Sequence, residues 1–263
     1  MAHLIGITQG RLTKSKTLQH FPKDYRREFF FAKKTKLDFI ELISEEKFNK
    51  KNPIWGERKK QYKILEKKYN LKLLYFCDNY VVANSINRIK TQNYLRSLID
   101  NISVLRIKYL IIPLLGASNI TLKNFKSYKK SLTKIYKYSL KNKIKLLIES
   151  NMAATTFLKI KKKFQLKYLL FLFDTGNRVC FYKNSYKDIL SFNKSIGHVH
   201  LKDKIDNKNV KINSGNVNFY NVFEALKIIN YKKNFTIESV RGSNPLITTQ
   251  KNLKFFKNLI SKN

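Results

Sequence analysis

Four residues whose side chains can bind a metal ion stand at the ends of short apolar segments. Glu149 ends LLIE, Asp174 ends LFLFD and His200 lies in HVHL. Glu238 follows FTI in the same manner. Three carboxylates and one imidazole suit a divalent cation such as Mn, Mg, Co or Zn, and the oxygen-rich set favours Mn or Mg. The sequence therefore predicts one divalent metal site.

An acidic residue at the end of a strand can also cap the helix that follows it. For any single one of these positions, capping explains the residue as well as metal binding does. It explains the whole set less well, because an ionised carboxylate directly after LLI, LFLF or FTI is poorly solvated without a cation or another partner. The sequence therefore favours a shared cation over independent caps.

The four residues belong to a series of eight short apolar runs that are rich in β-forming residues. The runs start about 23 to 37 residues apart, a spacing typical of parallel strands joined by crossover helices. They cover 4–8, 38–42, 72–76, 109–113, 145–149, 168–174, 197–201 and 234–238. Since neighbouring parallel strands lie about 4.8 Å apart, we expect the four side chains to meet at the carboxyl ends of the strands.

Segments with helical periodicity lie between these runs. Apolar residues share one helical face in 94–105 and again in 219–229. The sequence GITQGRL after the first run is neither a dinucleotide-binding nor a Walker motif. A chain of 263 residues without a Pro- or Gly-rich linker suits one barrel of about 250 residues. We therefore predict a single α/β domain over 1–263, a (β/α)8 TIM barrel with eight parallel strands.

The chain is strongly basic, with 54 Lys and Arg residues against 17 Asp and Glu residues and a formal net charge of +37. Such a charge attracts anionic partners, nucleic acid among them. The excess is mostly Lys, however, and it is spread along a chain that is also rich in Asn, Ile, Phe and Tyr. We interpret the excess of Lys as a result of AT-rich codon bias. The basic surface that it produces would favour anionic substrates such as sugar phosphates, and we do not expect nucleic acid as the main partner.

Cysteine usage and apolar run length bear on the location of the protein. Cys77 and Cys180 are too few for a disulfide framework or a Cys-based zinc site. No run approaches the roughly 20 consecutive apolar residues of a membrane span. Residues 1–10 have neither the basic region nor the cleavage site of an export signal. These features predict a cytoplasmic protein without a membrane partner.

The order of the motifs points to a known family. LLIES, FDTGN, HVHLKD, SGNVNF and TIESVRG resemble the motifs of the xylose isomerase-like TIM barrel superfamily of sugar phosphate isomerases and epimerases. GITQGRL in the first run and FIEL in the second extend the resemblance to nearly the whole chain. The most specific part is HVHLKD followed by GNVNF and a final strand that ends in Glu, whereas DTGN or IES alone would be weak.

The resemblance implies a small sugar-like substrate and assigns roles to the residues of these motifs. It implies that Glu149, Asp174, His200 and Glu238 hold the metal and that His198 packs behind them. Glu149 and Glu238 would also be catalytic, exchanging protons with opposite faces of the substrate while the metal polarises its carbonyl and stabilises an enediolate. Return of the proton to the same carbon gives epimerisation, and return to the neighbouring carbon gives aldose–ketose isomerisation. The sequence favours neither.

Further substrate contacts are expected around the same strand ends. Gln9 and Arg11 follow the first run and would contact hydroxyl or anionic groups, although an Arg in a loop is often only solvated. Glu41 in FIEL would contact the substrate or an Arg. Lys202 in HLKD would pair with a substrate oxyanion or with a neighbouring carboxylate. Arg241 in ESVRG would bind a phosphate or carboxylate.

Asn177 departs from the family pattern. Many members of the family carry a His three residues after the Asp of the sixth strand, where it contacts the substrate near the metal. Asn177 can still hydrogen-bond to a substrate but cannot carry a charge. The resemblance therefore does not transfer a particular epimerase substrate to this chain.

Two other functions fit parts of the sequence. The superfamily includes endonuclease IV, which cuts DNA at abasic sites, but its metal cluster needs several His residues on early strands, and this chain has none between His20 and His198. A non-catalytic barrel that binds a sugar is the second alternative, and the presence of all four ligand residues argues against it. Barrels of the family often pair through their helices, so a homodimer is expected by analogy.

Overall fold

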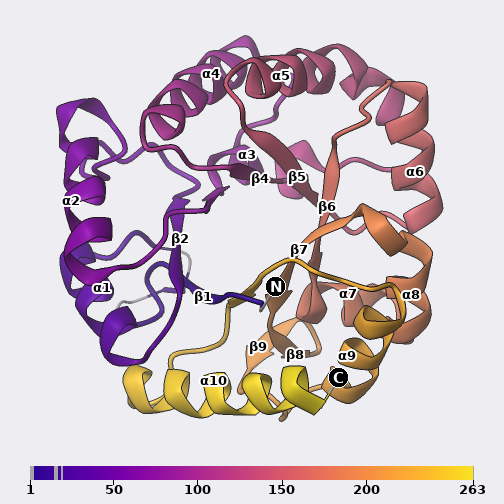
Figure 1. Ribbon diagram of the computed structural model, residues 1–263. Coiled ribbons are helices and arrows are strands. Elements are labelled where there is room, and N and C mark those ends of the chain that lie inside the picture. Colours follow the sequence, from indigo (N-terminus) through magenta and orange to yellow (C-terminus); the bar gives the residue numbers. More distant parts are fainter. Residues whose placement is uncertain (1–2, 15–16, 19, 263) are drawn as a thin grey trace. The chain divides into compact units, whose positions relative to one another are not determined.

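The computed structural model describes residues 3–14, 17–18 and 20–262. They fall into two compact units. The first unit comprises Met1–Ile40 and Phe171–Asn263, and the second comprises Glu41–Leu170. In both units parallel strands alternate with helices along the chain (Figure 1).

The sheet of the first unit has the strand order β1-β10-β7-β6. Its strands are β1 (Ile5–Thr8), β10 (Phe235–Ile237), β7 (Ile196–Leu201) and β6 (Leu170–Asp174). Nearly all of their residues are buried, as expected for parallel strands that are covered on both faces. Because the strands pair in parallel, their carboxyl ends lie at one edge of this sheet.

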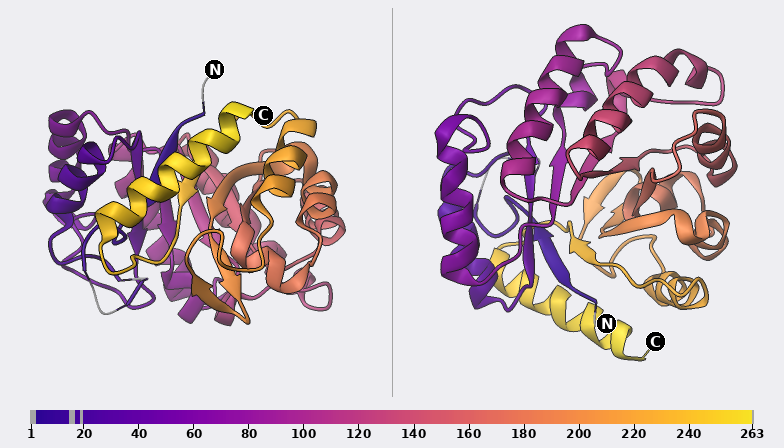
Figure 2. Two further views of the ribbon diagram at one scale, coloured as in Figure 1. Left: turned by 90° about the horizontal axis from the view of Figure 1, so that it is seen from below. Right: turned by 45° about the horizontal axis from the view of Figure 1, so that its top comes forward.

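Helices follow the strands of the first unit. They are α1 (Tyr25–Lys34), α7 (Thr175–Phe181), α8 (Ser185–Phe192), η4 (Asn193–Ser195), α9 (Phe219–Ile228) and α10 (Pro245–Lys262). The helix α8 packs against α9, and α10 packs against α9 and β10. Both views of Figure 2 show α10 as the long yellow helix near the end of the chain.

A short hairpin follows β7. It consists of β8 (Asp203–Ile205) and β9 (Lys208–Val210), which pair antiparallel. The Asp203 carboxylate accepts hydrogen bonds from the backbone N–H groups of Lys204, Ser214, Gly215 and Val217. A Cβ on Gly215 would lie 2.3 Å from Asp203 Oδ1, so a glycine is required for this close approach. Asp203 thus holds the backbone of residues 214–217, which follow the hairpin, next to the end of β7.

The sheet of the second unit has the strand order β5-β4-β3-β2. Its strands are β2 (Phe39–Ser44), which begins just before the boundary between the units, β3 (Tyr75–Asp78), β4 (Tyr109–Pro113) and β5 (Lys145–Glu149). Its longer helices are α2 (Lys60–Tyr69), α4 (Ile89–Val104), α5 (Lys129–Lys141) and α6 (Ala154–Lys163). Shorter turns of helix are η1 (Gly56–Lys59), α3 (Tyr80–Ala83), η2 (Gly116–Ser118) and η3 (Phe125–Tyr128).

The strand order confirms the predicted fold class. The strand orders of the two units are consecutive parts of one order, that of a closed eight-stranded parallel barrel, β1-β10-β7-β6-β5-β4-β3-β2. Each of the eight predicted runs overlaps one of its strands, and the predicted helical segments 94–105 and 219–229 overlap α4 and α9. The single domain over 1–263 stays a prediction. No helix in the described part of the chain is both long and apolar enough to span a membrane.

Candidate metal site

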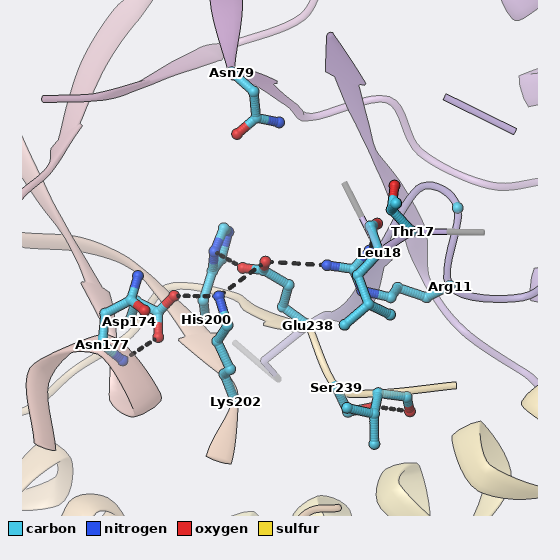
Figure 3. Close-up of polar contacts among 12 residues, drawn as sticks. Arg11, Thr17, Leu18, Asn79, Asp174, Asn177, His200, Lys202, Glu238 and Ser239 are labelled. Atoms are coloured by element: carbon cyan, nitrogen blue, oxygen red, sulfur yellow. Dashed lines mark hydrogen bonds and ion pairs between the residues drawn. The ribbon is translucent and has the colours of Figure 1, made fainter. Parts of the chain in front are cut away.

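Three of the four predicted ligands lie together in the first unit. One ligand atom from each of Asp174, His200 and Glu238 lies within 4.8 Å of the other two. His200 Nδ1 is 2.8 Å from Glu238 Oε2. All three side chains are buried, and Figure 3 shows their polar ends directed toward one another.

Strand register explains why these residues meet. Asp174 on β6 pairs with His200 on β7, and His200 pairs with Thr236 on β10. Glu238 comes one residue after β10, yet its backbone N–H still donates to Leu201 O at 3.0 Å. Three adjacent strands therefore present three ligand side chains from neighbouring positions at one edge of the sheet.

Lys202 lies between the two carboxylates of this group. Its Nζ is 3.2 Å from Asp174 Oδ2 and 3.1 Å from Glu238 Oε1 (Figure 3). The side chain is 6% exposed, so these contacts are made out of solvent. Lys202 thus pairs with neighbouring carboxylates, and its pairing with a substrate oxyanion stays a prediction.

The residues after Asp174 form the support of Lys202. Thr175 Oγ1 donates to Lys202 O at 2.6 Å and accepts from Lys202 N at 2.9 Å. A Cβ on Gly176 would lie 3.0 to 3.3 Å from the Cγ, Cβ and backbone carbon of Lys202. The sequence DTG therefore supplies one predicted ligand, hydrogen bonds to the backbone at the end of β7 and the space in which the Lys202 stem lies.

Arg11 reaches the same site from the loop after β1. Its Nη2 is 3.1 Å from Glu238 Oε1, and another guanidinium N–H donates to Leu18 O. The loop is held by Glu28 on α1, whose carboxylate accepts from Gly10 N at 2.9 Å, from Leu12 N at 3.3 Å and from the Thr13 hydroxyl. Glu28 thus fixes the backbone on both sides of Arg11.

Charge partners determine the protonation state of Glu238. Burial alone would raise the pKa of its carboxyl group. The nearby charge of Lys202, the contact with His200 and the charge of Arg11 outweigh burial and hold the pKa of Glu238 well below its usual range. Glu238 is therefore ionised, as a metal ligand or a proton acceptor must be.

The donor set fits a divalent ion. Ligand atoms bound to one octahedral ion at about 2.1 Å lie about 3 Å from one another, close to the separation between His200 Nδ1 and Glu238 Oε2. Two carboxylates with one imidazole are common ligands of Mn and Zn. Asp174 Oδ1 also accepts from Asn177 N at 2.9 Å, so Asp174 does cap the following helix, and its binding of a metal stays a prediction.

The other residues predicted for the site are distributed over both units. Gln9 is buried at the end of β1, and Asn177 is half-buried in the first turn of α7. Arg241 Nε donates to Gly10 O at 2.7 Å and its Nη2 to Thr17 O at 2.6 Å, so it binds the loop that carries Arg11. Their contacts with a substrate stay predictions.

Glu41 and Glu149 are buried residues of β2 and β5 in the second unit. Their participation in the site stays a prediction. His198, predicted to pack behind the ligands, is buried on β7, and its Nε2 lies 2.7 Å from the Thr236 hydroxyl.

Two residues that support the site were not identified from the sequence. Glu28 lies in the helical segment YRREFFFAKK, and its acidic side chain on the buried face of α1 was the available signal. Thr175 was visible only as part of the DTGN motif. In both cases the sequence contains the residue type but does not show which backbone groups it binds.

Comparison with known proteins identifies the family. A family model described as xylose isomerase-like TIM barrel matches residues 29–259. Comparison with curated protein sequences gives no match.

Three solved structures of similar fold are 14% to 17% identical to the chain. D-allulose 3-epimerase from Methylomonas sp. is 17% identical with a TM-score of 0.77, covering 98% of both chains. L-ribulose 3-epimerase is 14% identical with a TM-score of 0.79, covering 99% of this chain and 95% of that one. The IolI protein with a bound zinc atom is 14% identical with a TM-score of 0.75, covering 98% of both. At these identities the likeness shows the fold.

Proposed function

The chain belongs to the xylose isomerase-like TIM barrel family, and we propose that it is a metal-dependent isomerase or epimerase of a small sugar-like carbonyl compound. The observation that carries this proposal is the meeting of Asp174, His200 and Glu238 at the ends of three adjacent strands. The names of similar structures support it, since two are sugar 3-epimerases and a third holds zinc.

Asp174, His200 and Glu238 would hold the metal, with Glu149 as the fourth ligand. When bound, a divalent ion polarises the carbonyl group of the substrate and so makes the neighbouring C–H group acidic. Mn or Mg is favoured by the oxygen-rich ligand set, whereas zinc in the IolI protein favours a softer choice for this fold.

Glu238 is ionised, so its carboxylate can accept a proton. Glu149 is proposed as the second proton-transfer group, acting on the opposite face of the substrate. Lys202 and Arg11 bring two positive charges to Glu238 and would stabilise negative charge that develops on a substrate oxygen. Return of the proton to the same carbon would give epimerisation, and return to the adjacent carbon isomerisation.

The remaining contacts to the substrate are proposed from position in the sequence. Gln9, Glu41 and Asn177 would hydrogen-bond hydroxyl groups, and Arg241 would bind an anionic group. The net charge of +37 would favour a phosphorylated substrate over a neutral one through long-range attraction. Assays therefore need both sugars and sugar phosphates.

Solvent exchange tests the proposal directly. The purified chain, analysed for bound metal, is incubated with ketoses and their phosphates in deuterated water, and deuterium in the recovered sugar is measured. Glu149→Gln and Glu238→Gln are each expected to lower exchange by at least about 100-fold, because each removes a proton-transfer group. Glu224→Gln, on the exposed face of α9, is the matched control and should exchange as the wild type does.

Three outcomes would count against this function. Wild-type exchange in either active-site variant would remove the role given to that residue. Wild-type chain that binds no divalent metal and exchanges no substrate would overturn the proposal as a whole. Exchange that persists at full rate after removal of metal with EDTA would overturn the metal dependence.

A further inference from the structure

The position of Lys202 has a consequence for metal binding. We propose that Lys202 is a built-in competitor of the metal, because its ammonium group binds the same two carboxylates that a divalent ion would use. Lys202 would thereby hold metal affinity below what the ligand set alone can reach. This inference rests on the proposed function and adds a control of metal occupancy by a residue of the chain itself.

The contacts of Lys202 coincide with the predicted ligand set. Its Nζ lies 3.2 Å from Asp174 Oδ2 and 3.1 Å from Glu238 Oε1, within hydrogen-bonding distance of both carboxylates. Both carboxylates belong to the group that could hold a metal ion. Lys202 therefore bridges two strands in the way that an ion with the same ligands would.

The cluster of described residues in the first unit is already balanced in charge without an ion. Lys202 and Arg11 contribute two positive charges, and Asp174 and Glu238 contribute two negative ones. Lys202 Nζ and Arg11 Nη2 both lie 3.1 Å from Glu238 Oε1. A divalent ion that approaches this oxygen meets two cations at a site where low polarity strengthens repulsion.

The structure holds Lys202 in this position. Thr175 binds both the N–H and the C=O of its backbone, and the absence of a side chain at Gly176 leaves space for its stem. Lys202 is buried, whereas most Lys side chains of the chain are exposed or half-buried. A lysine that served only solubility would be exposed, and it would not need the space beside Gly176 or the two hydrogen bonds between its backbone and Thr175.

Metal binding and the Lys202 contacts are therefore mutually opposed. An oxygen that donates its lone pair to an ion has less electron density for the ammonium group, and the two positive charges repel. Metal uptake would weaken or break the Lys202 contacts and free its N–H groups for an oxygen of the substrate. The cost of releasing Lys202 would then appear as a weaker apparent metal affinity.

Calorimetric titration of the metal-stripped full chain with MnCl₂ tests the competition. Lys202→Met keeps the length of the stem and removes the charge, so it is expected to bind Mn²⁺ at least about tenfold more tightly than the wild type. Lys202→Arg retains a charge and is expected to bind no more tightly than the wild type. Lys204→Met, two residues along and outside the cluster, is the matched control and should keep wild-type affinity.

Thermal unfolding provides a second readout. Removal of the Lys202 charge leaves two buried carboxylates with fewer partners, so the metal-stripped K202M chain is expected to unfold at a lower temperature than the wild type. Added MnCl₂ should raise its midpoint more than it raises that of the wild type, because tighter binding gives a larger shift. Lys202→Gln, which is polar and also uncharged, gives the same test if K202M fails to fold.

The possible failures are distinguishable. Equal or weaker Mn²⁺ binding by folded K202M and K202Q, with wild-type binding intact, would overturn the competition and leave the proposed function standing. If K204M also binds Mn²⁺ more tightly than the wild type does, the gain is a general effect of lost positive charge, and the competition by Lys202 is overturned. Absence of Mn²⁺ binding in the wild type and in all variants would overturn both this inference and the proposed metal site.

Discussion

Two buried carboxylates at strand ends, one in each unit, behave in opposite ways. Glu238 follows β10 and is 5% exposed, while Asp78 ends β3 and is fully buried. The pKa of Glu238 lies well below its usual range, whereas burial raises the pKa of Asp78 from 3.8 to about 6. Similar burial thus produces an anionic group in one place and a group that can hold its proton in the other.

The neighbours of Asp78 explain this difference. Its carboxylate accepts hydrogen bonds from the Ser44 hydroxyl and, at 2.9 Å, from the Tyr94 hydroxyl. Backbone N–H groups of Tyr80 and Val81 add weaker support at the start of α3. These dipoles offset only part of the desolvation, and within the described part of the chain no Lys or Arg pairs with Asp78 as Lys202 and Arg11 pair with Glu238.

A buried acid at a strand end is therefore not by itself a metal ligand. Hydroxyl and amide donors hold Asp78 as a structural group, whereas full positive charges keep Glu238 ionised. The same distinction explains why a sequence pattern of acids after apolar runs includes both kinds of residue. Stability measured against pH separates them, because the two shifts have opposite signs.

The largest effect is expected for Glu238→Gln. Loss of this carboxylate leaves Lys202 and Arg11 with less counter-charge in a buried site, so the free energy of unfolding at pH 7 should fall by about 3 to 5 kcal/mol. Because the folded pKa is depressed, the contribution of Glu238 is complete above the unfolded value of 4.5 and is lost as pH falls further. Urea unfolding of the metal-stripped proteins should therefore show a difference in the free energy of unfolding between the wild type and E238Q that narrows only below pH 4.5. A difference that widens there would contradict the assignment.

A smaller effect of opposite sign is expected for Asp78→Asn. The raised folded pKa means that ionisation of Asp78 destabilises the fold as pH rises from 3.8 to about 6. A shift of this size corresponds to about 3 kcal/mol, at about 1.4 kcal/mol per unit. Asn keeps an acceptor for Ser44 and Tyr94 but cannot ionise, so D78N should gain that much relative to the wild type between pH 4 and pH 8. Urea titrations at several pH values measure this, and a pH-independent difference would refute it.

The smallest effect is expected for Glu28→Gln. Glu28 is bound by backbone N–H groups and a hydroxyl, and burial raises its pKa, so a neutral amide can replace it. We expect the free energy of unfolding at pH 7 to change by less than about 1 kcal/mol, whereas Glu28→Ala should lose about 2 kcal/mol by leaving buried N–H groups without an acceptor. Equal losses in both variants, measured by urea unfolding, would show that the charge of Glu28 matters after all.

The sequence predicted the parallel strands well because buried strands of this fold are apolar throughout. The runs 109–113 and 145–149 coincide with β4 and β5. The ends of other strands differ by a few residues; β3, for example, begins at Tyr75 rather than at residue 72. The hairpin of β8 and β9 was not predicted, since its polar residues lack the alternation that marks a half-buried strand.

Within the site, residue types were predictable and partners were not. The motifs placed Asp174, His200 and Glu238 at strand ends, and strand register brings them together. The sequence left two partners open for Lys202, because the direction of a long flexible side chain depends on the space left by Gly176. The partners and protonation of Glu28 and Asp78 could not be predicted, since desolvation and hydrogen bonding depend on neighbours that are distant along the chain.

The tie made by Asp203 separates two tasks that adjacent residues perform. Lys202 is directed to the carboxylates, while Asp203 gathers four backbone N–H groups and closes the segment from 204 to 217 into a ring. Substitutions between β8 and β9 change the far end of a loop whose two ends are held together by Asp203. The hairpin is therefore a natural position for exchange or lengthening in engineered forms of the chain, with the placement of Lys202 preserved.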